Sequence, residues 1–233
     1  MKPVAARGPI DRLVVAGVSR EAGFEVEMRL IAAGCQMVAG IDEVGRGAWA
    51  GPLTVGVAVV TEECLAGFPA GVRDSKLLTP RQREQLFEPL SQHVLCHAFG
   101  NASAAECDRL GMVVAQRLAA ARALDELGVV PDGIIVDGLR DFTGRAGAVS
   151  IVKADRRCAV VATASILAKV TRDRMMVAAS GIHPGYGFER NKGYASVEHR
   201  LAVARLGTTP IHRLTWSVAP VGPVSAEDLW PVP

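Results

Sequence analysis

Hydrophobic residues along the chain gather in short runs that are separated by polar turns. Met37–Ile41 is one such run, and Leu53–Val60 follows it after a polar turn. His93–Phe99 has the composition of a third strand. Short runs rich in β-branched residues, bounded by glycine, proline and polar residues, are typical of β-strands. Because only a turn and a short helix separate these three, we predict an antiparallel meander over residues 37–99.

Beyond residue 100, helical periodicity alternates with two further apolar runs. Ser103–Leu127 carries apolar residues at helical spacing and is interrupted near Gly111, which predicts two helices. Gly133–Asp137 and Ala148–Val152 are the predicted fourth and fifth strands, and the former has the continuous apolar run of a buried parallel strand. A long helix is expected over residues 159–178. The pattern predicts an α/β fold with a five-stranded mixed sheet flanked by helices.

Two more helices are expected beside this sheet. Glu21–Ala33 has apolar residues at helical spacing with charges between them. Thr79 followed by Pro80 suits an N-cap and first helical position, for a helix that continues to about Leu90. The nearby pair of histidines around Cys96 does not predict a metal site, because in a strand the cysteine would point away from both.

The formal charges nearly balance, with 26 Lys and Arg against 24 Asp and Glu. Attraction to nucleic acid would therefore have to come from clustered basic residues. The five cysteines are widely scattered without a Cys-x-x-Cys pair, which argues against a disulfide framework or a zinc site. No apolar run approaches the roughly 20 residues of a membrane span, and the first residues lack the apolar core of a signal peptide. We expect a cytoplasmic protein without a membrane anchor.

Candidate chemistry centres on Gly40–Gly47, where Asp42 and Glu43 end the first strand and a Gly-Arg-Gly turn, Gly45–Gly47, follows. Two adjacent carboxylates offer the hard oxygen ligands that Mg²⁺ and Mn²⁺ take. Glycines on both sides of an arginine let backbone N–H groups approach a phosphate closely. The alternative interpretation is that the acidic pair only ends a strand in a solvated turn.

Two further carboxylates lie where the same sheet edge is expected. Asp137 closes the predicted fourth strand, and ligand sites in open α/β sheets lie at such carboxyl ends. Asp155 follows the fifth strand and precedes the long helix. Taken alone, Asp137 is equally a turn former before Gly138, and Asp155 equally an acidic residue at a helix start. With Asp42 and Glu43, they would converge at one edge of a mixed sheet.

Hydroxyl and basic side chains are candidates for contacts to a phosphate backbone. Ser75 and Lys76 lie in an Asp-Ser-Lys loop and suit phosphate oxygens, although the bare sequence describes only a loop. On the long helix, Ser165, Lys169 and Arg172 recur at helical spacing on one stripe. Such a stripe is usually solvated, and here it could equally line a duplex backbone.

Three segments of the chain closely resemble bacterial ribonuclease HII. Ala39–Gly47, continued by Ala50–Leu53, is a long match without gaps to the signature of that family. Ala164–Arg174 and Tyr186–Tyr194 follow in the family's order. The resemblance divides the chain into an N-terminal extension (1–20), a catalytic domain with a C-terminal helical part (21–216) and a Pro-rich tail (217–233).

This resemblance implies a ribonuclease H-like fold with a C-terminal helical and loop extension. It implies an endonuclease that hydrolyses the RNA strand of RNA·DNA hybrids and cuts 5′ of single ribonucleotides embedded in duplex DNA, leaving 3′-hydroxyl and 5′-phosphate ends. Two divalent ions, Mn²⁺ or Mg²⁺, and a monomeric state are expected. The implied catalytic and metal-binding residues are Asp42, Glu43, Asp137 and Asp155, and the implied substrate-binding residues are Gly45, Arg46, Gly47, Ser75, Lys76, Ser165, Lys169 and Tyr194.

Two alternatives to this activity remain open from the sequence. The first is another metal nuclease or strand-transferase of the ribonuclease H-like type that acts on DNA and needs no 2′-hydroxyl. The second is a non-catalytic hybrid-binding module, which is disfavoured because four carboxylates beside a phosphate would oppose binding without metal ions. The related ribonuclease HIII carries an additional N-terminal substrate-binding domain, for which residues 1–20 offer too short a segment.

Overall fold

The computed structural model describes residues 21–215. Its sheet has the strand order β3-β2-β1-β4-β5. The first three strands are antiparallel neighbours, whereas β4 runs parallel to β1, and β5 runs parallel to β4. The predicted five-stranded mixed sheet and its antiparallel meander are therefore confirmed. The strands are β1 (Val38–Val44), β2 (Leu53–Val60), β3 (Cys96–Ala102), β4 (Gly133–Asp137) and β5 (Ala148–Ile151).

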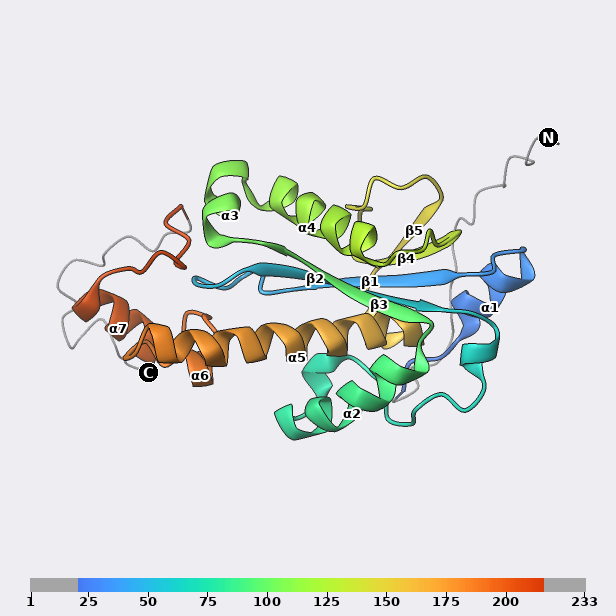
Figure 1. Cartoon of the computed structure of the whole chain (residues 1–233), viewed down its shortest axis with the longest axis horizontal. Helices are drawn as coiled ribbons and strands as arrows, with labels where there is room; N and C mark the ends of the chain where they lie inside the picture. The colour runs from blue at the N-terminus through green and yellow to red at the C-terminus, as the bar shows by residue number, and fades with distance from the viewer. Residues whose placement is uncertain (1–20, 216–233) are drawn as a thin grey trace, which may run out of the picture.

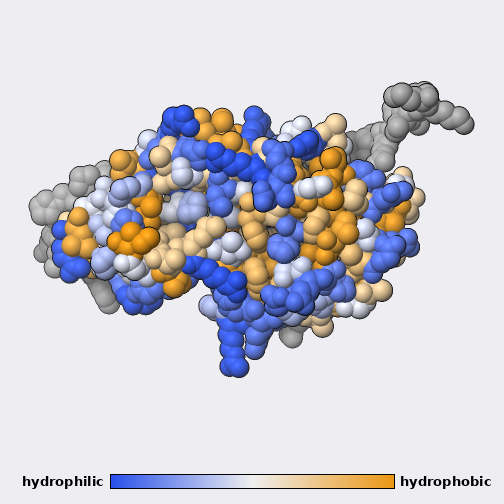
Figure 2. Space-filling model, viewed as in Figure 1, coloured by the Kyte–Doolittle hydropathy of each residue, from blue (hydrophilic) through white to orange (hydrophobic). Residues whose placement is uncertain are grey.

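Helices cover both faces of this sheet. Figure 1 shows α3 and α4 on one face, α5 and α2 on the other, and α6 and α7 near the C-terminal end of α5. The last two form the expected C-terminal helical extension. The face in Figure 2 is hydrophilic over α2, whose sequence is largely polar. The helices are α1 (Glu25–Ala32), α2 (Pro80–His93), α3 (Ala104–Leu110), α4 (Met112–Glu126), α5 (Ala159–Ile182), α6 (Phe188–Asn191) and α7 (Val197–Leu206).

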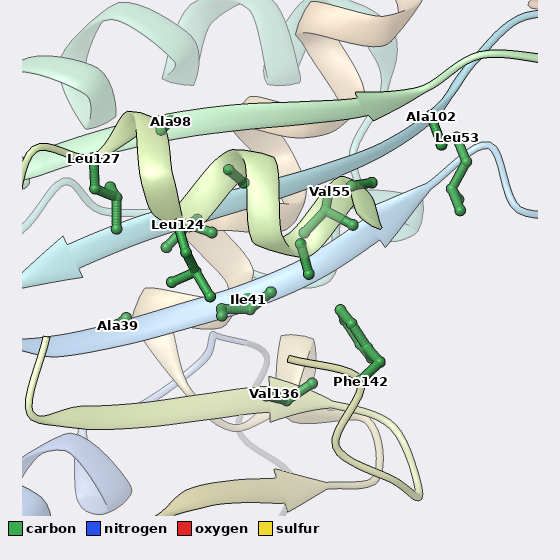
Figure 3. Packing of buried hydrophobic residues seen from close by; sticks show 14 of the residues in the cluster. Ala39, Ile41, Leu53, Val55, Ala98, Ala102, Leu124, Leu127, Val136 and Phe142 are labelled. Atoms are coloured by element: carbon green, nitrogen blue, oxygen red, sulfur yellow. The ribbon is translucent and has the colours of Figure 1, made fainter. Parts of the chain in front are cut away.

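The hydrophobic core has two layers, one on each face of the sheet. Ile41 and Val55 pack with Leu124 on the α4 side, as Figure 3 shows. Val38, by contrast, packs with Val160 on the α5 side. Because successive strand residues point to opposite faces, the residues of β1 with even numbers face α5. Asp42 therefore belongs to the α5 side of the sheet, next to the long helix.

Gly56 lets α5 approach the sheet closely at the level of Asp42. The two residues are partners across the β1–β2 ladder. A Cβ at Gly56 would lie 2.7 Å from the carbonyl oxygen of Ala164 and 2.8 Å from Cβ of Ala168. Only glycine fits there without a shift of the helix. The close approach places Ser165, which lies between those two helix residues, near Asp42.

Several predicted boundaries are right and one strand start is wrong. Thr79 caps α2 as predicted, with a reciprocal capping box to Gln82. The prediction of a strand from His93 is incorrect, because His93 is the last residue of α2 and β3 begins at Cys96. The ladder explains the difference. Cys96 pairs with Val59 near the end of β2, so residues before it have little neighbouring strand to pair with.

The expected N-terminal extension, residues 1–20, and the Pro-rich tail, residues 217–233, lie outside the described residues. None of the helices within residues 21–215 combines the length and apolar character required to cross a bilayer.

Candidate active site

One hollow of about 430 Å³ collects most of the residues that the sequence singled out. We call it the acidic hollow. Asp42 reaches it from β1, and Asp137 reaches it from the end of the adjacent parallel strand β4. Eleven of the twelve predicted site residues line it, and the twelfth is Asp155. The eleven are Asp42, Glu43, Gly45, Arg46, Gly47, Ser75, Lys76, Asp137, Ser165, Lys169 and Tyr194.

Asp155 is connected to this hollow through a lysine. It lies in a 3₁₀ turn, Ala154–Arg156, just before α5, and is only 3% exposed. Its Oδ2 lies 3.6 Å from Nζ of Lys76, which does line the hollow. The backbone N–H of the residue before Asp155 donates a 2.7 Å hydrogen bond to Oδ1 of Asp137. The turn that carries Asp155 is thus bonded directly to Asp137.

Burial and repulsion by neighbouring carboxylates raise the pKa values of Asp42, Glu43 and Asp155. Burial is the largest cause for Asp42, whose pKa rises to about 8, and the charge of Glu43 adds to it. Burial also comes first for Asp155, whose pKa rises to about 6, with neighbouring carboxylates contributing. The pKa of Glu43 is raised mainly by burial as well. The surrounding protein therefore leaves negative charge at this site uncompensated, which is the electrostatic environment of a cation site.

The side chains do not form a ready-made ligand set. Among residues 21–215, no three His, Cys, Asp or Glu side chains are grouped so that they could hold a metal ion. The contacts of the acids explain this. Oε1 of Glu43 lies 3.8 Å from Nη1 of Arg46, and Asp155 is paired with Lys76. Both cations are substantially exposed, so their release costs little.

The Asp-Ser-Lys loop is fixed beside the acids by residues that the sequence did not indicate. Asp74 is 1% exposed, accepts the backbone N–H of Lys76 at 2.9 Å and binds Nε of Arg156 at 2.9 Å. It thereby ties the loop to the turn that carries Asp155. Ser75 is buried, and its hydroxyl accepts a 2.9 Å hydrogen bond from Ser165 on α5. An aspartate in a loop carries no sequence signal for such a role.

Arg83 of α2 is a second residue that the sequence did not single out. It is buried, and its Nη1 donates to the carbonyl oxygens of Ser75 at 2.7 Å and Leu78 at 2.5 Å. The loop is therefore held from both α2 and α5. Lys76 points from this loop into the acidic hollow, where it pairs with Asp155, and 77% of its side chain is exposed.

Arg172 does not lie on a solvated or substrate-facing stripe of α5. It is completely buried and donates to three backbone carbonyls, those of Pro52 at 2.8 Å, Lys192 at 2.9 Å and Ala50 at 3.0 Å. A Cβ at Gly45 would lie 2.1 Å from its Nε, so glycine is required for this approach. The helical spacing predicted a shared face with Ser165 and Lys169, but the loop between β1 and β2 folds over this end of the stripe.

Arg213 holds the same loop from the C-terminal segment. It is completely buried and donates to the carbonyls of Gly51 and Arg46, from Nη2 and Nη1 respectively, both at 3.0 Å. We call Arg172 and Arg213 together the guanidinium clamp. The clamp fixes the Gly-Arg-Gly turn, and Arg172 also bonds the segment that leads to Tyr194. Neither arginine has a carboxylate partner within 4.0 Å in the described chain.

Comparison with known families connects this geometry to a protein class. The model of the family described as ribonuclease HII matches residues 39–219. The chain belongs to the ribonuclease HII family. It is therefore a ribonuclease H, an enzyme that hydrolyses phosphodiester bonds.

Curated relatives within the ribonuclease HII family support this assignment. Ribonuclease HII of Streptomyces avermitilis is 48% identical over 185 residues, which cover 79% of this chain and 78% of that protein. A ribonuclease HII of Thermus thermophilus is 49% identical over 177 residues, covering 76% of this chain and 84% of that protein.

Solved structures confirm the ribonuclease H-like fold. The crystal structure of ribonuclease H2 from Pyrococcus horikoshii has a TM-score of 0.67 and 33% identity, covering 78% of this chain and 95% of that one. A ribonuclease HIII crystallised in complex with Mn²⁺ has a TM-score of 0.62 and 22% identity, covering 78% of this chain and 67% of that one. The latter likeness shows the shared fold alone.

Proposed function

We propose that this enzyme hydrolyses the RNA strand of RNA·DNA hybrids and cuts 5′ of single ribonucleotides embedded in duplex DNA, leaving 3′-hydroxyl and 5′-phosphate ends. One observation carries the proposal most directly. Asp42, Asp137 and Asp155 are far apart in sequence, yet they lie at one edge of the sheet in a chain of the ribonuclease HII family. Tyr194 and the Gly45–Gly47 turn line the same hollow.

Asp42, Glu43, Asp137 and Asp155 would hold divalent cations, with Asp42 as the ligand shared by two ions. The donor set fits, because all four supply carboxylate oxygens, and the raised pKa values of Asp42, Glu43 and Asp155 reflect uncompensated charge. The Mn²⁺ in the ribonuclease HIII neighbour agrees with this choice. When bound, Mn²⁺ or Mg²⁺ would supply Lewis-acid activation of water and stabilise the leaving oxygen.

The remaining residues of the hollow would bind and orient the substrate. Lys76 and Lys169 carry the positive charge that suits phosphate oxygens, and Ser75 and Ser165 supply hydroxyls. A Cβ at Gly47 would meet no atom within 4 Å, so this part of the turn is open for close approach of a phosphate to the backbone. The turn would also bring the polar groups that recognise the 2′-hydroxyl, with the Arg46 side chain 51% exposed beside it.

Tyr194 would pack on the sugar next to the ribonucleotide. Its side chain lines the hollow and is half-buried, with the Lys169 ammonium 5.7 Å and the Arg172 guanidinium 5.4 Å from the ring centroid. Two neighbouring cations interact with this ring and restrict its position. A ring held in this way suits recognition of a sugar more than a general contact with DNA.

The substrate test compares three duplexes with and without Mg²⁺ or Mn²⁺. One DNA duplex contains a single ribonucleotide, the second is its all-DNA match, and the third is a long RNA·DNA hybrid. We expect cleavage of the first and third, with 5′-phosphate products, and none after chelation by EDTA. Cleavage of the all-DNA duplex would favour the alternative DNA nuclease. Tighter binding of the hybrid without metal than with it, and no cleavage, would favour the binding module.

We further propose a cytoplasmic location, a monomeric state and RNA·DNA hybrid or ribonucleotide-containing DNA as the partner. None of the five cysteines, which all lie within the described residues, forms a disulfide, which suits a reducing compartment. Size-exclusion chromatography with light scattering, at several protein concentrations, tests the monomeric state.

A further inference from the structure

Two buried histidines lie behind the Tyr194 loop in direct contact with each other. His199 is in α7 and His212 in the following segment, and they are 0% and 2% exposed. Their Nε2 atoms are 3.0 Å apart. Tyr186 and Phe188 pack around both rings.

The outer partners of this pair determine where its protons lie. Nδ1 of His212 is 2.9 Å from the backbone N–H of Thr209, which can only donate. His212 must therefore accept at Nδ1 and carry its proton on Nε2. That proton points at Nε2 of His199, which must accept and carry its own proton on Nδ1. Nδ1 of His199 lies 2.9 Å from the carbonyl oxygen of Tyr194, which can only accept.

The result is one directional chain of hydrogen bonds from Thr209 through both imidazoles to Tyr194. Each ring is neutral and in one tautomer, and an additional proton would place two N–H groups face to face at one of the contacts. The pKa values agree with this geometry. Burial, with repulsion by His199 adding to it, lowers the pKa of His212 to about 4. Burial also lowers the pKa of His199.

The end point of the chain is the residue proposed to recognise the sugar. The carbonyl of Tyr194 also accepts the backbone N–H of Ser196, and the preceding carbonyl, that of Gly193, accepts from Trp49 and Ala50 of the β1–β2 loop. The Tyr194 backbone is therefore fixed on one side by the histidine chain and on the other by the loop that carries the Gly-Arg-Gly turn. A small shift there would move the ring within the hollow.

We propose that His199 and His212 are positioning residues that set ribonucleotide recognition by fixing the backbone of Tyr194. This inference rests on the proposed function, because it assigns Tyr194 the contact to the sugar. The histidines do not touch substrate in this scheme. Their contribution depends on which nitrogen of each imidazole carries the proton. It acts through the hydrogen bond that the His199 Nδ1–H donates to the Tyr194 carbonyl.

Two amide variants of His199 separate this role from simple packing. The amide of Asn in His199→Asn can occupy the Nδ1 position and still donate to the Tyr194 carbonyl. The amide of Gln in His199→Gln reaches the Nε2 position, where it satisfies His212 but removes the side-chain donor to the Tyr194 carbonyl, which keeps only the backbone N–H of Ser196. Both remove an aromatic ring from the same buried cluster, so both should lower the melting temperature similarly.

The readout is the kcat/KM for the single-ribonucleotide duplex. We expect the kcat/KM of His199→Gln to fall roughly tenfold to a hundredfold, because a misplaced contact group weakens catalysis. The kcat/KM of His199→Asn should stay within about threefold of the wild type. Equal losses in both variants, or no loss in His199→Gln, would overturn the proposal. Tyr194→Ala is measured beside them. If Tyr194→Ala cleaves normally or the wild type cuts all-DNA duplex, the proposed function itself fails.

The proton order can be read from the wild-type protein without any variant. Long-range ¹H–¹⁵N correlation spectra of the imidazoles distinguish the two neutral tautomers. We expect His199 protonated on Nδ1 and His212 protonated on Nε2 at neutral pH. The opposite tautomer at either ring, or an imidazolium, would refute the directional chain even if the enzyme has the proposed activity.

Discussion

The acidic hollow and the guanidinium clamp both contain buried ionisable side chains. They differ in whether the surrounding protein stabilises or opposes the charged form of those side chains. In the clamp, Arg172 is completely buried and its guanidinium donates to three backbone carbonyls. In the hollow, Asp42 is 5% exposed, accepts the backbone N–H of Glu43, and lies among other acids. The arginine's donors are used by the fold, whereas the aspartate's charge is opposed by its neighbours.

The difference separates a framework charge from a site charge. A buried ion whose hydrogen bonds are supplied by the protein stabilises a loop and needs nothing further. A buried ion whose pKa is strongly raised, as that of Asp42 is to about 8, lies where a bound partner can supply the missing counter-charge. Burial alone does not distinguish the two cases. The partners of each polar atom do.

The strongest test of this distinction is Asp42→Asn. Losing one ligand charge at the reaction centre should reduce cleavage of the single-ribonucleotide duplex on the order of a thousandfold or more, since such stabilisation is worth several kcal/mol. Duplex binding, measured by fluorescence anisotropy, should persist because the basic contacts remain. In EDTA the variant should melt no earlier than the wild type, since it removes a buried carboxyl group whose ionised form is disfavoured in the folded state.

The matched control is Asp125→Asn, which removes an exposed aspartate whose carboxylate lies 3.5 Å from Arg145. It should leave both cleavage and melting essentially unchanged. Cleavage by Asp42→Asn at the wild-type rate would show that the acidic hollow is not the reaction centre.

A substitution in the guanidinium clamp should, in contrast to Asp42→Asn, mainly lower the free energy of unfolding. Arg172→Met removes three donors and leaves buried carbonyls without partners, which should cost about 3–5 kcal/mol of unfolding free energy. Arg174→Met, two residues further along α5, is the matched control. Arg174 is half exposed and pairs with an exposed Glu84, so its loss should cost less than about 1 kcal/mol. Urea denaturation measures both, and equal small losses would contradict the framework role of Arg172.

The sequence predicted the sheet and the acids for the same physical reason. Runs of β-branched residues mark strands, and a carboxylate directly after such a run lies at the strand end, as Asp137 does. Local patterns extend over neighbouring residues only, so the start of β3 was placed too early at His93. Where that strand begins depends on the length of its partner β2, which is a tertiary property.

The framework of the site could not be predicted in this way. Arg172 contacts Ala50, which is 122 positions away, and its helical spacing is that of an ordinary solvated residue. His199 and His212 are 13 positions apart, and nothing local reveals that their Nε2 atoms meet. The roles of such residues can be recognised only from the three-dimensional structure, because each one binds a carbonyl or imidazole that is distant in the sequence.

Glu27 is an intermediate case, and it gives the smallest of the expected effects. Glu27 of α1 is completely buried against the start of α5, where its Oε1 accepts the N–H of Val160 at 2.9 Å, whereas Oε2 has no hydrogen-bond partner in the described chain. Burial raises its pKa from 4.5 to about 7. Because the folded-state value is the higher one, the stability linked to this group is full below about pH 4.5 and is lost as the pH rises to about 7.

Glu27→Gln keeps the bond to Val160 but cannot ionise, so its stability should not fall over this range. The variant should therefore gain on the wild type between about pH 5 and pH 8, by up to about 3 kcal/mol in urea denaturation. Glu25→Gln, an exposed position of the same helix, should show no such trend. A difference between Glu27→Gln and the wild type that stays constant with pH would mean that Glu27 keeps one protonation state throughout. Its second oxygen would then have a partner, and Glu27 would belong with the framework charges.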